Sequence, residues 1–295
     1  MKYYAISFHV TPCSQDACDI LSALAGEAGC ESFADSTDGL EAYVQQQLFD
    51  QHMLDTLIAD FPLADTHISY DMTEVEDRDW NEAWEQEGFP PIVIPSSMPT
   101  ATRPTCLIIH DGRHLPDTTA DTARGLQIEI DTRQAFGTGT HETTRMICAL
   151  LLETELEGKT VLDCGCGTGI LSICALKLGA ARCTAYDIDE WSTENTRHNA
   201  VINQVEQQLT IMHGDASLTD GMNQPFDLVA ANINRNILLN DMPRFVRVMA
   251  PTAQLILSGF YVSDCDILQT AARQLGLTHV ATRSDGQWAC MVFRK

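Results

Sequence analysis

Residues Val161–Ser172 of the chain are VLDCGCGTGILS, in which an apolar, strand-like run passes through three glycines into a helical pattern. A strand, a glycine turn and a helix N-terminus allow a nucleotide to lie directly against backbone N–H groups. The glycines follow the spacing G-x-G-x-G, whereas the dinucleotide fingerprint G-x-G-x-x-G needs its third glycine where Ile170 stands. The P-loop pattern G-x-x-x-x-G-K-[ST] is also missing from the sequence. The spacing therefore disfavours a nicotinamide cofactor and phosphoryl transfer.

The sequence after Val161 alternates between strand and helix patterns. Strands are predicted at 160–164, 182–187, 209–213, 226–231 and 253–258, with a closing pair at 277–283 and 287–293. Strands that alternate with helices in this way form an α/β fold with a doubly wound, mostly parallel, Rossmann-like sheet. A ligand of such a sheet lies at the carboxyl ends of the strands, beside the point where the strand order reverses.

A carboxylate ends the second predicted strand, 22 residues after Gly165. Asp187, in the stretch AYDIDE, is placed to accept hydrogen bonds from ribose hydroxyls, and Asp189 is a weaker candidate for the same role. With Asp163 in front of the loop, the run becomes D-x-G-x-G-x-G. This combination resembles the class I S-adenosylmethionine-dependent methyltransferases, in which the loop around Gly165 and Gly167 would cradle the methionine part of the donor.

The fourth predicted strand ends in FDLVAANINRN, which places Asn232 at the mouth of the expected site. Amine methyltransferases of the resembling class have a polar residue here that holds the target nitrogen. Ile233 follows in this chain, without the proline pair of the N-P-P-Y motif, which argues against the glutamine and adenine amino-methyltransferases. The alternative is that Asn232 only caps the end of the strand.

A second glycine and threonine cluster lies upstream, in AFGTGTHETTR at 135–145. It precedes a helix predicted from Arg145 to Glu153, so Thr143 and Thr144 are candidates to cap that helix and to face the donor's carboxylate. His141 is expected to fix the loop rather than to act as a base, because methyl transfer to an amine needs little base catalysis.

The first part of the chain has a different pattern. It predicts a strand at 3–10, a helix at 14–28, two strands that meet at a turn over 37–39, a helix at 50–61 and a strand at 66–75. The order βαββαβ is that of a small ferredoxin-like α+β domain. We therefore predict three parts: this domain at 1–75, a linker helix at 76–88 that includes Trp80 and Trp84, and a methyltransferase domain at 89–295.

Negative charge is concentrated in the first third of the chain. The net charge is −23, and residues 1–87 hold 19 acidic residues but only Lys2 and Arg78 as basic ones. Such a segment repels nucleic acid, so we expect a basic protein partner and no direct nucleic-acid binding. The alternative is that the acidic surface merely keeps the protein soluble.

The remaining features limit the class of protein. The start MKYYAISFHV does not have the pattern of a signal peptide and no run of about 18 apolar residues occurs, so we expect a soluble cytoplasmic protein without membrane contact. The eleven cysteines include no C-x-x-C pair and suggest neither disulfides nor zinc. His110 and His114 have helical spacing but no third ligand in the sequence, so they are interpreted as loop histidines and no metal site is predicted.

The motifs together give a closer resemblance. FGTGTHETT, DCGCGTG, DID and ANI, in this order behind a ferredoxin-like domain and a DWNEAW linker, resemble the ribosomal protein L11 methyltransferase family, known as PrmA. The resemblance implies S-adenosylmethionine as donor, bound at Thr144, Gly165, Asp187 and Asn232. It implies an N-terminal domain that docks the ribosomal protein, and several methyl transfers to an N-terminal α-amine and to lysine ε-amines. Relatives of this catalytic domain methylate lysines of other basic proteins, which is the alternative substrate.

Three further alternatives stay open at this point. A nucleobase methyltransferase would share the catalytic domain, but the acidic first third opposes nucleic-acid binding. A non-catalytic adaptor would not need Gly165, Gly167, Asp187 and Asn232 together. A dehydrogenase is disfavoured by the glycine spacing.

Overall fold

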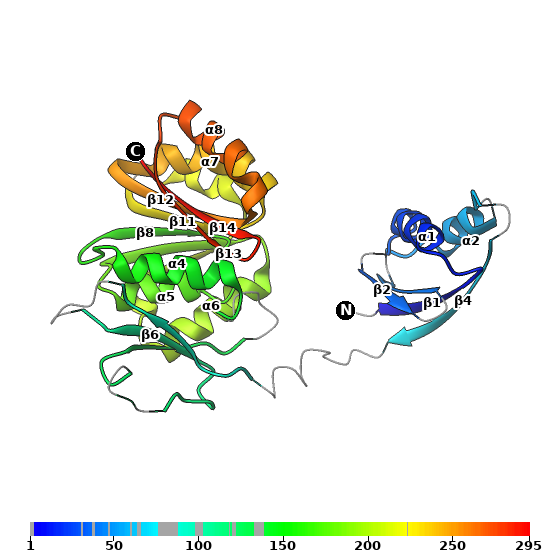
Figure 1. Cartoon of the computed structure of the whole chain (residues 1–295), viewed down its shortest axis with the longest axis horizontal. Coiled ribbons are helices and arrows are strands. Elements are labelled where there is room, and N and C mark those ends of the chain that lie inside the picture. Colours follow the sequence, from blue (N-terminus) through cyan, green and yellow to red (C-terminus); the bar gives the residue numbers. More distant parts are fainter. Residues whose placement is uncertain are drawn as a thin grey trace. The chain divides into compact units, whose positions relative to one another are not determined.

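The chain divides into two units, Met1–Glu82 and Ala83–Lys295, which are coloured blue to cyan and teal to red in Figure 1. The computed structural model describes residues 3–30, 32–36, 39–46, 48–59, 61–63, 66–75, 88–97, 103–117, 119, 122–132, 139–222 and 224–295. The predicted linker helix at 76–88 lies, except for Gly88, outside the described residues.

The small unit contains two helices and a four-stranded antiparallel sheet. Its elements are β1 (Tyr3–Thr11), α1 (Gln15–Glu27), β2 (Ser32–Ser36), β3 (Gly39–Gln45), α2 (Gln51–Ala59) and β4 (His67–Val75). The strand order is β2-β3-β1-β4, and all neighbouring strands are antiparallel. Both helices lie on the same face of the sheet (Figure 1). The six elements occur where the sequence predicts them, with small differences at their ends.

Alternation along β1 explains why one face of this sheet is covered. Ile6, Phe8 and Val10 point to the buried side, where they pack with Leu21 of α1 and Leu54 of α2. These inward residues have a period of two, as a strand with one buried face requires. The apolar side chains of both helices therefore pack against the inner face of the sheet.

The large unit is built around a seven-stranded sheet. Its strands are β8 (Thr160–Cys164), β9 (Arg182–Asp187), β10 (Leu209–His213), β11 (Phe226–Asn232), β12 (Met249–Tyr261), β13 (Thr278–Asp285) and β14 (Trp288–Arg294). The order is β10-β9-β8-β11-β12-β14-β13, in which the first five strands are parallel and β14 is antiparallel to both of its neighbours. The predicted α/β fold with a mostly parallel sheet is confirmed. The strand order reverses between β8 and β11, where a ligand is expected.

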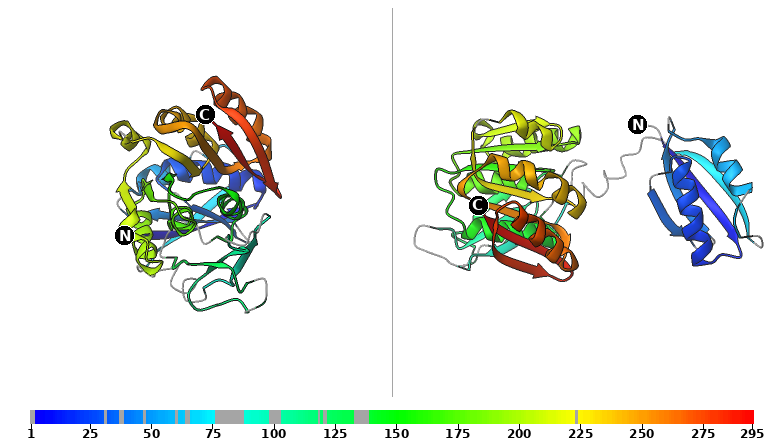
Figure 2. Two further views of the ribbon diagram at one scale, coloured as in Figure 1. Left: turned by 90° about the vertical axis from the view of Figure 1, so that its left-hand side faces the viewer. Right: turned by 90° about the horizontal axis from the view of Figure 1, so that it is seen from above.

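Helices cover both faces of this sheet. They are α4 (Glu142–Glu153), α5 (Ile170–Lys177), α6 (Glu190–Ile202), α7 (Arg235–Val248) and α8 (Cys265–Gln274). Figures 1 and 2 show α7 and α8 together on one face, with α4, α5 and α6 on the other. Each face has its own apolar core, and Ile147 and Ile173 belong to one core while Phe245 and Leu268 belong to the other.

A three-stranded sheet precedes this fold and was not predicted. It consists of β5 (Ile92–Pro95), β6 (Cys106–His110) and β7 (Leu126–Glu129), in the order β5-β6-β7. β6 pairs antiparallel with β5 and parallel with β7, and its five residues are buried. The interpretation of His110 as a loop histidine is wrong, because His110 ends β6, is 5% exposed, and accepts a hydrogen bond from Gly112 N at Nδ1.

Candidate active site

The loop after β8, here called the donor loop (Gly165–Gly169), needs glycine at its turning points. Gly165, Gly167 and Gly169 have φ angles of 75°, 54° and 80°, in the left-handed region that side chains with a Cβ rarely adopt. A Cβ on Gly165 would also lie 2.5 Å from Cγ2 of Ile233. The loop therefore presents bare backbone at the end of β8, directly in front of the first turn of α5.

Asp163 supports this loop from below. Its side chain is 0% exposed, and its Oδ2 accepts hydrogen bonds from Ser172 N (3.1 Å) and Ser172 Oγ (2.7 Å). Burial raises the pKa of Asp163 to about 6. Asp163 thus fixes α5 to β8 from inside the protein.

Asp187 lies at the carboxyl end of β9, beside the loop. Its Oδ2 accepts a hydrogen bond from Gly167 N at 2.9 Å, and its Oδ1 accepts one from Asp189 N at 3.1 Å. Asp189 has a different role from the one suggested for it, because its carboxylate caps α6 by accepting from Ser192 N (3.0 Å) and Ser192 Oγ (2.8 Å). Asp187 is thus the carboxylate of this pair that faces the site.

Asn232 ends β11, next to β8 and across the point of strand reversal. Its Nδ2 donates a hydrogen bond to Thr144 Oγ1 on α4 at 3.2 Å. Its Oδ1 is buried and has no hydrogen-bond partner among the residues that the structure describes. The following helix α7 is capped by Asn234, which accepts from Ile237 N at 3.1 Å. Asn234 rather than Asn232 therefore caps α7.

The start of α4 differs from the prediction. The helix begins at Glu142, three residues before Arg145, and its N-cap is His141, whose Nδ1 accepts from Thr143 N at 3.3 Å. Thr143 and Thr144 therefore lie inside the first turn, each 1% exposed, and do not cap the helix. His141 also packs against the ring of Trp288, with centroids 4.7 Å apart, which fits the predicted loop-fixing role.

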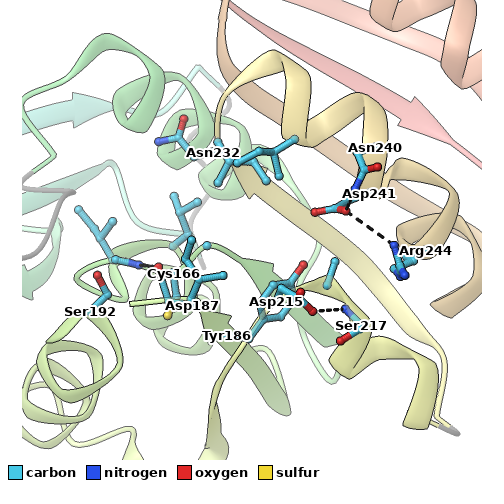
Figure 3. A pocket seen from close by; sticks show the side chains of 18 of the residues that line it. Cys166, Tyr186, Asp187, Ser192, Asp215, Ser217, Asn232, Asn240, Asp241 and Arg244 are labelled. Carbon is cyan, nitrogen blue, oxygen red and sulfur yellow. Dashed lines mark hydrogen bonds and ion pairs between the residues drawn. The ribbon is translucent and has the colours of Figure 1, made fainter. Parts of the chain in front are cut away.

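One cavity of about 570 Å³ joins these elements at the carboxyl edge of the sheet (Figure 3). Its lining includes Thr144, Gly165, Gly167, Asp187 and Asn232, whereas the candidates Thr143 and Asp189 do not line it. A cavity of this size is in the range of small-molecule and cofactor sites. The sequence motifs, which are far apart in the chain, therefore form one pocket.

The family-model comparison matches residues 24–295 to the family described as ribosomal protein L11 methyltransferase (PrmA). The chain belongs to this family. It is 45% identical over 295 residues to the ribosomal protein L11 methyltransferase of Bacteroides thetaiotaomicron and 45% identical over 293 residues to that of Bacteroides fragilis, with 99% of each chain covered in both comparisons. A solved structure of ribosomal protein L11 methylase from Lactobacillus delbrueckii subsp. bulgaricus matches with a TM-score of 0.56 and 27% identity, over 64% of this chain and 95% of that one.

Membership of the ribosomal protein L11 methyltransferase family confirms the resemblance seen in the motifs. It also removes the dehydrogenase alternative, since the family transfers methyl groups. Among the described residues, no group of three or more His, Cys, Asp or Glu side chains is arranged to hold a metal ion. No helix in the described part of the chain is long and apolar enough to cross a membrane.

Sequence reasoning missed the far end of the pocket of this methyltransferase. Asp215 and Ser217 follow β10, and Ser217 N donates to Asp215 Oδ1 at 2.8 Å. Hydrogen bonds from the side chain and then the backbone of Ser217 lower the pKa of Asp215. Their signal was available, because Asp215 follows a predicted strand as Asp187 does. Asp241 and Arg244 line the pocket from α7 (Figure 3). The sequence did not indicate this, because polar residues on an amphipathic helix normally face solvent.

Proposed function

We propose that this protein transfers methyl groups from S-adenosylmethionine to amine nitrogens of ribosomal protein L11, at its N-terminal α-amine and at lysine ε-amines. The observation that carries the proposal is the buried Oδ1 of Asn232, a hydrogen-bond acceptor without a partner among the described residues, inside the pocket formed by the donor loop. A buried amide oxygen in this state is costly unless a ligand donates to it. An amine N–H is a suitable donor.

The residues around the loop fit the proposed methyl donor. When bound, S-adenosylmethionine supplies a methyl group that is already activated by its sulfonium. Gly165 and Gly167 give it bare backbone, Asp187 offers a carboxylate for ribose hydroxyls, and Thr144 stands in the first turn of α4, where N–H groups suit a carboxylate. The protein therefore needs mainly to bind and orient the two reactants.

Asn232 has the position required to orient the amine. Thr144 fixes its amide through Nδ2, so Oδ1 can accept an amine N–H and leave the nitrogen lone pair directed at the methyl carbon. The amine must be neutral to attack. At pH 7 this costs about 4.6 kcal/mol for a lysine and about 1.4 kcal/mol for an α-amine. The α-amine is therefore the easier substrate, and His141 is not needed as a base.

The small unit is proposed to recognise the protein substrate. Its βαββαβ order and its strand order β2-β3-β1-β4 support a ferredoxin-like domain. The sequence has no Lys or Arg between residues 3 and 77, so the carboxylates of this unit favour a basic partner such as a ribosomal protein and disfavour RNA. A ribosomal substrate also supports the proposal that the protein works in the cytoplasm.

The test is incubation of the full chain with radiolabelled S-adenosylmethionine and total ribosomal proteins from a strain without this methylation. Gel autoradiography and mass spectrometry then identify the labelled protein and its modified nitrogens. A single labelled band of ribosomal protein L11 with methylated amines is expected. Label on another basic protein would retain the reaction and replace the substrate, while label on RNA or no binding of the donor would overturn the proposal.

A further inference from the structure

Helix α6 presents a row of buried asparagines to the rest of the large unit. Asn195 and Asn199 lie in α6 and Asn203 is its C-cap, and because the three are spaced by four residues they lie on one face. Their exposed fractions are 3%, 0% and 7%. Buried amides are costly unless all of their hydrogen-bonding groups are paired. The contacts of these side chains therefore show what the row holds in place.

One side of the row binds the backbone where the chain leaves β7, here called the β7 exit (residues 129–132). Asn203 accepts from Glu129 N at 3.1 Å and donates to Glu129 O at 2.7 Å. Asn195 donates to Asp131 O at 2.9 Å, and Asn199 accepts from Asp131 N at 2.9 Å. The side-chain amides thus hydrogen-bond to the backbone N–H and C=O groups of this segment, as a neighbouring β-strand would.

The other side of the row binds the donor loop. Asn199 Nδ2 donates to Thr168 O at 2.9 Å, and the neighbouring Thr196 Oγ1 donates to Gly167 O at 2.8 Å. Both carbonyls belong to the turn whose Gly167 N–H binds Asp187. Of the three asparagines, Asn199 is the one whose amide contacts both the β7 exit and the loop, since its oxygen faces Asp131 and its nitrogen faces Thr168.

We propose that Asn199 is a positioning residue that couples the donor loop to the β7 exit. One side-chain amide holds both segments, since its oxygen accepts from Asp131 N and its nitrogen donates to Thr168 O. The residue thereby fixes the donor loop, on the donor side of the pocket, to the segment that follows β7. This inference rests on the proposed function for the identity of the ligand.

The chemistry of the contact requires an amide at this position. A carboxylate at position 199 could accept from Asp131 N but would place charge against the carbonyl of Thr168. Alanine would leave both backbone groups without their partner. Asn203→Ala is the matched control. Asn203 belongs to the same row and is similarly buried, but its side chain binds Glu129 and not the donor loop.

The experiment measures amide hydrogen exchange of the full chain with and without S-adenosylhomocysteine, the product of the proposed reaction. In the wild type and in Asn203→Ala, we expect the product to protect both the donor loop and residues 129–132. In Asn199→Ala, we expect the product to protect the donor loop but no longer residues 129–132, and its Kd to rise roughly tenfold, the effect of one lost hydrogen bond. Melting temperatures of the two variants should be similar.

If Asn199→Ala and Asn203→Ala showed the same protection and the same Kd, the inference would be overturned. The asparagines would then only stabilise the fold. If Asn199→Ala does not fold, Thr196→Val decides, because it removes the hydroxyl bond to Gly167 O with little change in volume. Weaker product binding by Thr196→Val would support a role of this helix face in holding the loop, and unchanged binding would oppose it. Absence of any protection in the wild type would instead count against the proposed function.

Discussion

The two units differ in how their carboxylates are paired. In the large unit, Asp187 at the pocket accepts from Gly167 N, and the buried Asp163 behind the donor loop accepts from Ser172. In the small unit Glu41 and Glu74 are exposed, and the sequence offers no Lys or Arg between residues 3 and 77 to neutralise them. Carboxylates near the pocket of the large unit therefore fix backbone, whereas the excess negative charge of the small unit is the feature to which the proposed function assigns recognition of a basic partner.

The largest effect is expected from Asn232→Ala in the large unit. Loss of the amide oxygen leaves the amine unoriented, so turnover should fall by roughly 10²-fold while the Kd of the donor stays nearly constant. Steady-state kinetics with ribosomal protein L11 and calorimetric titration of the donor measure the two quantities. The control is Asn234→Ala, which removes the cap of α7 at a cost of about 1 kcal/mol in stability and should preserve turnover. A parallel fall in donor affinity would contradict this role of Asn232.

The next effect concerns stability and belongs to the large unit alone. The pKa of Asp163 is raised to about 6, so its neutral form favours folding and its contribution is lost as pH rises from about 4 through 6. Asp163→Asn removes this loss while its amide oxygen can still accept from Ser172. As pH rises from 4 to 7, the difference in free energy of unfolding between the variant and the wild type should therefore change by up to about 3 kcal/mol in favour of the variant. Urea unfolding at several pH values measures the difference, and a constant difference would contradict the shift.

Asp187→Ala should weaken the donor by about tenfold, because a charged hydrogen-bond acceptor is lost from the pocket. Turnover at saturating donor should change less than the Kd. Asp189→Ala is the control, because it removes the cap of α6 two residues away but does not line the pocket. Equal losses of donor affinity in the two variants would show that the carboxylate acts through the local fold.

The smallest effect is expected in the small unit. Neutralising Glu41 and Asp71 together, as Glu41→Gln and Asp71→Asn, should lower kcat/KM for the protein substrate by roughly threefold at low salt and leave donor binding unchanged. The matched pair in the large unit, Glu206→Gln and Asp266→Asn, also removes two exposed charges. If both pairs had the same effect, net charge rather than the small unit would govern recognition.

The sequence predicts most of the large unit because strands such as β8, β11 and β14 are largely buried and its turns are marked by glycine. The strands that end in Cys164, Asp187 and Asn232 occur close to their predicted positions, so the pocket could be anticipated from residues at strand ends. The three-stranded sheet escaped prediction because β5 and β7 have four residues each and β5 lies in a proline-rich stretch. The start of α4 was placed late because histidine is not a common cap.

Side chains that bind backbone at long range were also beyond prediction. Asn195, Asn199 and Asn203 have the spacing of a helix face, and a polar face normally indicates exposure to solvent. Their partners lie more than 30 residues away in the chain, so nothing local marks the row as buried. Arg244 was missed for the same reason, since its position on α7 gives no sign that it faces the pocket.

The most direct test of the proposed function is methylation of purified ribosomal protein L11 by the full chain with labelled S-adenosylmethionine, followed by mass spectrometric mapping of the modified nitrogens. We expect methyl groups on amine nitrogens, formed fastest at the α-amine and increasingly fast as pH rises toward the amine pKa. Transfer that ignores ribosomal protein L11 in favour of RNA, or donor that binds without any transfer to amines, would contradict it.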